Sequence, residues 1–242
     1  MPPRELGLGN RSSAFGSGGI EKRLDALAGL TTIRGDRLLD IGCADGTYTL
    51  RLADGFRTVD AVDIEPERLA AFRAALDGDP AAGKITLAQM SAEQLDFTAE
   101  SFDVVTTIEV LEHVGDLDRT IGEIHRVLKP GGKFLITSPN RYFPFETHGF
   151  DFRGRRHSPA HGPFLPWVIP LHNRLADARA FTVRTLSAEI EGHGFDRLGV
   201  DYIMPPFDRS SVGRKIKPVL DRVERSPLKF FGMALILVFR KS

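Results

Sequence analysis

The residues best suited to chemistry lie in a short run from Leu38 to Leu50, with the sequence LLDIGCADGTYTL. Apolar residues lead into an acid, Asp40, and a turn with two glycines follows at 42–46. Such a turn lets backbone approach a small molecule closely, because glycine has no Cβ to obstruct it. The pattern predicts a strand, a tight turn and the start of a helix arranged around a bound ligand.

A second acid stands at the end of the next apolar run, VDAVDI at 59–64. An acid at the tip of the second strand, such as Asp63, is placed to accept hydrogen bonds from ribose hydroxyls. The two motifs together predict a nucleoside-containing cofactor at the carboxyl edge of a parallel sheet. A dinucleotide pattern would need a third glycine three residues after Gly46, where the sequence has Thr49, so a dinucleotide is disfavoured.

Apolar runs and helical spacings alternate along the chain around these motifs, which predicts a doubly wound parallel α/β sheet. The predicted strands span 37–42, 58–63, 84–89, 102–108, 133–138, 197–203 and 232–239, and the predicted helices span 20–33, 46–54, 66–76, 116–128 and 184–193.

Further motifs follow in a fixed order: SAEQLDF at 91–97, SFDVV at 101–105, EVLEHV at 109–114, RVLKPGGKFLI at 126–136 and SPNR at 138–141. In this order and spacing the sequence resembles class I S-adenosylmethionine-dependent methyltransferases. It is most similar to the branch that includes ubiquinone-biosynthesis O-methyltransferases. The resemblance implies a Rossmann-like, seven-stranded, mostly parallel sheet with the last strand antiparallel. It also implies S-adenosyl-L-methionine as cofactor and S-adenosylhomocysteine as product.

The same resemblance implies cofactor contacts for residues at the tips of four strands. These residues are Asp40, Gly42, Cys43, Ala44, Gly46, Asp63, Ile64, Ser91, Ala92, Glu93, Ile108 and Glu109. Asp40 would help to hold the cationic amino group, and Asp63 would bind both ribose hydroxyls. Ile64 would lie against the adenine, whose edge would meet the segment around Ala92, and Glu109 would lie near the sulfonium.

Histidine is the natural general base if the acceptor is a hydroxyl, since its unperturbed pKa is about 6.5. The catalytic candidates are His113 and His148, while His157 and His161 share the same late segment.

A metal site is an open alternative at Glu109, Glu112 and His113. If these residues are helical, Glu109 and His113 share a face, and a later histidine could complete a divalent-cation site. This pattern is similar to the metal site of methyltransferases that modify the 3′ ends of small RNAs. In the simpler alternative, Glu109 touches the cofactor while Glu112 and His113 brace the start of a helix.

Segments outside the sheet motifs are predicted to shape the acceptor site. We expect a flexible N-terminal arm at 1–19 and one domain at 20–242, with lid insertions at about 141–182 and 205–229. The run PFLPWVIP at 163–170 either forms the lid's own core or contacts a membrane or a prenyl chain, helped by nearby arginines.

Composition is that of an ordinary globular chain, with 242 residues, 42% hydrophobic and 26% charged, and zero formal net charge. Residues 1–140 hold 15 Lys/Arg and 22 Asp/Glu, whereas residues 141–242 hold 17 and 10. That asymmetry fits either ordinary surface variation or a C-terminal part facing an anionic substrate or membrane. The lone Cys43 excludes an intrachain disulfide and fits a cytoplasmic location, with peripheral contact at the inner membrane face as an extension.

These observations predict methyl transfer to a small-molecule hydroxyl, on a quinone precursor or on a sugar or lipid-linked glycan. One alternative is a metal-dependent RNA 2′-O-methyltransferase, which the neutral charge and the lack of an added RNA-binding module disfavour. Another is a non-catalytic cofactor-binding regulator on the same fold. The acceptor and the oligomeric state are not specified by the sequence.

Overall fold

A computed structural model of the chain describes residues 18–158, 162–206 and 211–242. Seven strands form one sheet in the order β3-β2-β1-β4-β5-β9-β8. They are β1 (Gly35–Ile41), β2 (Phe56–Asp63), β3 (Ile85–Gln89), β4 (Phe102–Ile108), β5 (Leu128–Pro139), β8 (Phe195–Ile203) and β9 (Ala234–Lys241). Within this sheet β9 runs antiparallel to both of its neighbours, and the other pairs are parallel. The predicted fold class, with its antiparallel last strand, is confirmed.

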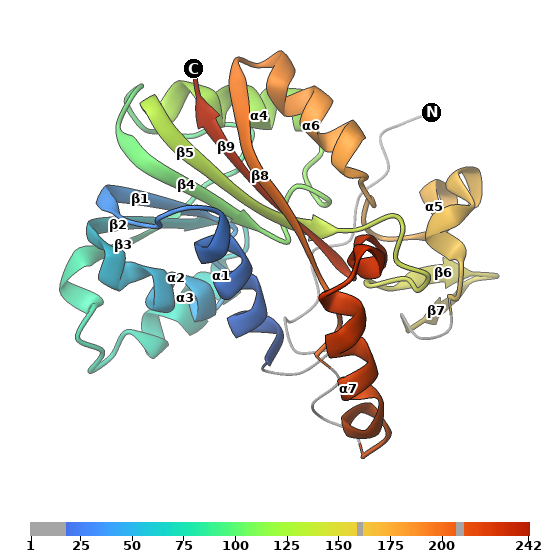
Figure 1. Ribbon diagram of the computed structural model, residues 1–242. Helices are drawn as coiled ribbons and strands as arrows, with labels where there is room; N and C mark the ends of the chain where they lie inside the picture. Colours follow the sequence, from blue (N-terminus) through green and yellow to red (C-terminus); the bar gives the residue numbers. More distant parts are fainter. Residues whose placement is uncertain (1–17, 159–161, 207–210) are drawn as a thin grey trace.

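Helices cover both faces of the sheet because successive strand residues point to opposite sides. Leu38 packs into one buried apolar cluster and Leu39 into the other. One face carries α1 (Gly18–Leu30), α2 (Thr47–Leu52) and α3 (Pro66–Ala75), and the other carries α4 (Leu117–Val127) and α6 (Val183–Gly192) (Figure 1). This arrangement brings the carboxyl ends of the parallel strands to one common edge.

The helical placement considered for Glu109 and His113 is wrong, because the chain between β4 and α4 does not form a helix there. Glu109 has a left-handed backbone (φ 58°), and the chain turns through residues 111–113 before α4 begins at Leu117. Asp116 caps that helix by accepting a hydrogen bond from the Arg119 amide. The two carboxylates and the histidine therefore point in directions set by a turn and not by a helical repeat.

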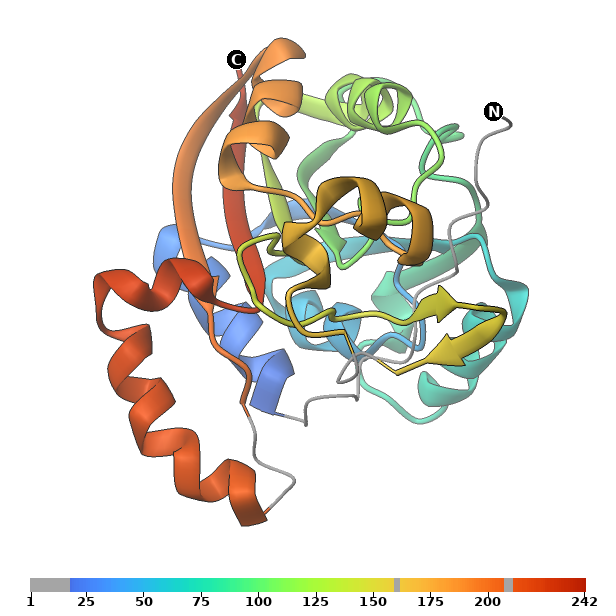
Figure 2. The same ribbon diagram turned by 90° about the vertical axis from the view of Figure 1, so that its right-hand side faces the viewer.

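Two segments beyond the common strand edge contain structure of their own. The 141–182 segment holds a hairpin of β6 (Phe150–Phe152) and β7 (Arg155–His157), then η4 (Leu165–Trp167) and α5 (Ile169–Leu175). The 205–229 segment contains α7 (Ser211–Glu224) and leads into η5 (Pro227–Phe231), and α7 projects from the sheet (Figures 1 and 2). The predicted arm at 1–19 lies almost wholly outside the described residues. None of the described helices has the length and apolar character needed to cross a membrane.

Candidate cofactor and catalytic site

The turn after β1 requires glycine for packing as well as for ligand approach. Gly42 and Gly46 have left-handed backbones, with φ of 72° and 81°. A Cβ on Gly42 would lie 2.4 Å from Val110 Cγ2, and one on Gly46 would lie 2.1 Å from the Phe72 ring. The turn is therefore pressed between α3 and the chain that follows β4, which fixes its backbone in place.

Asp63 ties this turn to the tip of β2. Its carboxylate accepts hydrogen bonds from the amides of Ala44 and Glu65, each at 2.9 Å. The side chain is buried, yet it lines an open cleft at the carboxyl edge of the sheet. An ionised acid in this position can accept from the two hydroxyls of a ribose.

The cleft collects many of the predicted cofactor residues. Those that line it are Gly42, Asp63, Ile64, Ser91, Ala92, Glu93 and Glu109, together with His113. Ile64 is 53% exposed, so it offers an apolar surface on which a planar base can lie. Met90 and Arg68 also line the cleft and were not predicted, because no motif marks them.

Asp40 and Cys43 are instead buried, and neither is among the residues that line the cleft. The two carboxylate oxygens of Asp40 accept hydrogen bonds from the hydroxyls of Thr49 (2.5 Å) and Thr106 (2.7 Å). Burial raises the pKa of Asp40 to about 6, against the effect of these two hydrogen bonds. Burial also raises the pKa of the Cys43 thiol, which keeps it protonated. The predicted contact of Asp40 with the cofactor's amino group stays a prediction.

Glu93 shapes the cleft by bracing the chain opposite. Its Oε1 accepts hydrogen bonds from the amides of Gly115 (2.8 Å) and Asp116 (3.0 Å), immediately before α4. Ser91 in turn accepts from the Glu93 amide through its hydroxyl, at 3.2 Å. The segment predicted to meet the adenine edge therefore also fixes the start of α4.

Glu109 is drawn toward α1 by a partner that sequence reasoning missed. Its Oε1 accepts a hydrogen bond from the Thr137 hydroxyl at 3.0 Å and lies 3.4 Å from Arg23 Nη2. Arg23 comes from α1, and its side chain is 11% exposed. No sequence motif marks Arg23, because only the packing of α1 against the sheet brings it to the strand edge.

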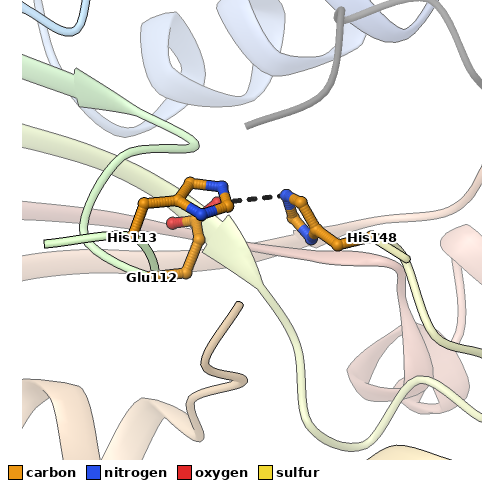
Figure 3. Close-up of side chains that lie close together, drawn as sticks. All are labelled: Glu112, His113 and His148. Carbon is orange, nitrogen blue, oxygen red and sulfur yellow. Dashed lines mark ion pairs between the residues drawn. The ribbon is translucent and has the colours of Figure 1, made fainter. Parts of the chain in front are cut away.

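Glu112, His113 and His148 converge beside the cleft (Figure 3). One potential ligand atom from each lies within 4.8 Å of those of the others. The two imidazole rings meet edge to face, with centroids 4.8 Å apart, and His148 Nε2 is 3.9 Å from Glu112 Oε1. The sequence predicted both histidines as catalytic candidates, and the structure brings them together from chain positions far apart.

Burial sets the charge states in this group. Glu112 is fully buried, and burial together with the nearby Glu109 raises the pKa of its carboxyl well above the usual value. Burial also lowers the pKa of His148, which favours the neutral imidazole near neutral pH. Ser138 donates a hydrogen bond to Glu112 Oε2 at 3.0 Å, while Oε1 receives none from the described residues.

This group of side chains is chemically suited to two tasks. A neutral imidazole beside a carboxyl can take a proton from an acceptor hydroxyl. One carboxylate oxygen and two imidazole nitrogens are also a donor set that divalent cations bind. The residues that could bind a metal differ from the set considered from sequence. Glu109 pairs with Arg23, and His148 joins Glu112 and His113. Of the remaining late histidines, His157 stacks on Phe150, and His161 lies outside the described residues.

Comparison with known proteins finds that this chain is similar to methyltransferases. Residues 39–136 match the family described as "Methyltransferase domain". A demethylmenaquinone methyltransferase of Symbiobacterium thermophilum is 32% identical over 66% of this chain and 63% of its own length. A ubiquinone biosynthesis O-methyltransferase of Xanthomonas oryzae is 37% identical over 49% of each chain. The matches thus span between about half and two thirds of these curated relatives.

The fold extends over more of the chain than the sequence similarity does. The crystal structure of an S-adenosylmethionine-dependent methyltransferase from Mesorhizobium loti aligns with 90% of this chain and 96% of its own. The TM-score is 0.63 and the sequence identity is 23%, so this likeness concerns the fold alone.

Proposed function

We propose that this chain, which carries a class I S-adenosylmethionine-dependent methyltransferase domain, transfers a methyl group to a hydroxyl oxygen of a small-molecule acceptor. The observation that carries the proposal is the meeting of His113, His148 and Glu112 at the edge of the cleft. A cleft with ribose- and adenine-binding groups serves the donor, and a partly buried imidazole pair beside it serves the acceptor.

The residues of the cleft hold and orient the donor. Asp63 accepts from the ribose hydroxyls, Ile64 packs against the adenine, and the 42–46 turn lets the methionine end approach the backbone. S-adenosylmethionine supplies an already activated methyl group, so the protein contributes mainly position, electrostatics and exclusion of water.

The histidines act on the acceptor. His113 lines the cleft itself, whereas His148 comes from the 141–182 segment and contacts the His113 ring. One imidazole takes the hydroxyl proton as the oxygen attacks, and for His148 the nearby charges of Glu109 and Glu146 favour the imidazolium that forms. Because His148 comes from the lid segment, the base is complete only when that segment is in place.

A quinone precursor is the first acceptor class, and a sugar or lipid-linked glycan hydroxyl is the second. Support for the first comes from the names of the two relatives, a demethylmenaquinone methyltransferase and a ubiquinone biosynthesis O-methyltransferase. Both classes present a hydroxyl that a neutral histidine can deprotonate during transfer.

A tritiated-methyl transfer screen over quinol, sugar and RNA acceptors tests the proposal. We expect label on a quinol or sugar and a loss of about 10²- to 10⁴-fold in His148→Ala or His113→Ala, the range for a general base. His193→Ala is the matched control, because His193 pairs with Asp118 at the surface, away from the cleft. Transfer to RNA alone, or full activity in both site variants, would refute the proposal.

A cation-assisted form of the same reaction is the second candidate, favoured by the donor set of Glu112, His113 and His148. In that case a chelator abolishes transfer and added Mn²⁺ or Mg²⁺ restores it. Calorimetric titration with Mn²⁺ alone gives an independent readout, in which wild-type protein binds and His148→Ala does not. Activity that is unchanged after chelation would exclude this form.

A further inference from the structure

Large apolar side chains are exposed mainly in the two segments beyond the strand edge. In the described residues all of them except Ile64 and Leu198 belong to 141–182 or to α7 and η5. The most exposed are Phe164, Trp167, Val168, Ile169, Val219 and Leu228, which are 47% to 61% exposed. Apolar side chains gathered in this way on a surface mark an interaction site.

Aromatic contacts join these two segments where η4 meets η5. The Trp167 ring lies 4.9 Å from Phe164 and 6.4 Å from Phe231, measured between centroids. Its indole N–H donates to the carbonyl of Tyr142 at 3.2 Å. The β6–β7 hairpin adjoins the end of α5 through a bridge between Phe150 and Ala176. We call the hairpin, η4–α5 and α7–η5 together the apolar–basic face.

Basic side chains surround the apolar ones on this face. Most acids nearby are paired, with Asp177 bound to Arg156, Asp221 to Lys217 and Glu224 to Lys22 of α1, whereas Asp151 of the hairpin has no ion-pair partner among the described residues. Basic side chains on the face that form no ion pair within the described part of the chain are Arg153, Arg155, Arg174, Lys215, Arg222 and Arg225. The face therefore combines exposed aromatic and aliphatic groups with a surplus of positive charge.

We propose that the apolar–basic face docks on an anionic lipid bilayer. Phe164, Trp167 and Ile169 enter the interfacial layer, while Arg155 and Lys215 lie at the level of lipid phosphates. This combination of apolar insertion and polybasic attraction is what holds proteins at a bilayer surface without a spanning helix. The positive balance of residues 141–242, against the negative balance of 1–140, orients the molecule with this face toward the membrane.

The docking is independent of the methyl acceptor, and it goes beyond the proposed function. It extends the membrane contact considered for 163–170 to the hairpin tip and α7. In Figure 2 the hairpin, α5 and α7 lie toward the viewer, on the side of the carboxyl ends of the strands.

Trp167 is the only tryptophan in the chain, so its fluorescence reports directly on docking. We expect a blue shift when the full chain meets vesicles of phosphatidylcholine mixed with phosphatidylglycerol, and quenching by brominated lipid chains. Pure phosphatidylcholine vesicles should bind far less, and raised salt should weaken binding to the anionic ones. An unchanged Trp167 spectrum with anionic vesicles would overturn the proposal.

Surface variants separate the electrostatic contribution to vesicle binding from the apolar contribution. Lys215→Glu with Arg222→Glu should lower partitioning onto anionic vesicles more than tenfold, since each basic residue contributes about fivefold. Val168→Ser with Ile169→Ser should lower it about tenfold by removing apolar burial. Matched controls are Arg57→Glu, on the opposite end of β2, and Leu198→Ser, on the edge strand β8.

Equal binding by the site variants and the controls would refute the face as the docking surface. Wild-type dimers that become monomers in Val168→Ser with Ile169→Ser, without any vesicle binding, would overturn the proposal in favour of contact between two copies. Thermal melts of each variant confirm that the fold is retained in either case.

Discussion

Asp40 is an acid buried in the centre of the sheet, and its environment opposes its charge. Burial raises its pKa from 3.8 to about 6, although two threonine hydroxyls donate to it. An acid whose pKa is higher in the folded chain destabilises the fold as pH rises from about 4 to about 6. At neutral pH the ionised side chain therefore lowers the free energy of unfolding, by at most about 3 kcal/mol for a shift of this size.

Asp40→Asn is expected to stabilise the protein above pH 6 and to have no effect below pH 4. Asparagine keeps the shape and one acceptor for Thr49, but it carries no charge to bury. Urea unfolding from pH 4 to pH 8 measures the difference. A free-energy difference between variant and wild type that does not change with pH would contradict this account of Asp40. If Asp40 helps to hold the cofactor, the same variant binds S-adenosylmethionine more weakly.

Single residues at strand tips were the most predictable part of the site. Asp63 and Ile64 stand where the sequence places them, because the end of an apolar run marks the end of a strand. Arg23 could not be predicted, since its approach to Glu109 depends on how α1 crosses the sheet. The meeting of His113 with His148 likewise depends on the path of the 141–182 segment, which no periodic pattern specifies.

At the scale of elements, the 141–182 segment is anchored by a buried pair. Glu146 and His172 are 3% and 1% exposed, and their Oε2 and Nε2 atoms are 2.9 Å apart. Glu146 Oε1 also accepts from the amides of Thr147 (3.0 Å) and His148 (3.1 Å). Burial disfavours the charged carboxylate, but the interaction with His172 and these amides lowers the pKa of Glu146 overall. Glu146 thus joins α5 to the backbone that carries His148.

Glu146→Ala should impair methyl transfer through the position of His148. Removing one member of a buried pair typically lowers the free energy of unfolding by about 3–5 kcal/mol. We expect kcat to fall by at least about tenfold below the melting temperature, as a misplaced catalytic group implies. S-adenosylmethionine affinity should stay unchanged, because Glu146 does not line the cleft. Transfer kinetics and calorimetry on the same sample measure the two effects.

Glu146→Gln is the conservative partner of this variant. The amide oxygen can still accept from the two backbone amides, so His148 stays in place and activity is largely retained. A purely structural role would instead lower stability in Glu146→Ala and leave kcat unchanged at low temperature, which would contradict the positioning role.

At the scale of the whole molecule, the alternation of strands and helices was enough to predict the sheet. Leu38 and Leu39 pack into the apolar clusters on opposite faces of the sheet, and this alternation specifies a strand covered on both faces. Comparison with known proteins confirms the predicted fold, and residues 39–136 match the methyltransferase domain that the sequence motifs predicted. The β6–β7 hairpin and α7 were missed, because the two hairpin strands have only three residues each and Pro218 inside α7 argues against a helix in the sequence.

Cofactor binding should stabilise the whole fold, because the cleft joins the tips of several strands. At a concentration one hundred times its Kd, a ligand adds about 2.7 kcal/mol to the free energy of unfolding. For a chain of this size that is a rise in Tm of roughly 5–10 °C. Differential scanning fluorimetry with S-adenosylmethionine measures it. Asp63→Asn should lose most of the shift at the same concentration, because the ribose hydroxyls lose a charged acceptor.

The matched control is Asp60→Asn, on the same strand three residues earlier, where the acid pairs with Arg37 and does not reach the cleft. This variant should keep the full rise in Tm, although its starting Tm can differ from that of wild type. Subtracting each variant's own melting temperature without ligand separates cofactor binding from the loss of the Asp63 contacts to Ala44 and Glu65. An equal shift in both variants would show that Asp63 only braces the turn, and the ribose would then have to be held by other residues of the cleft.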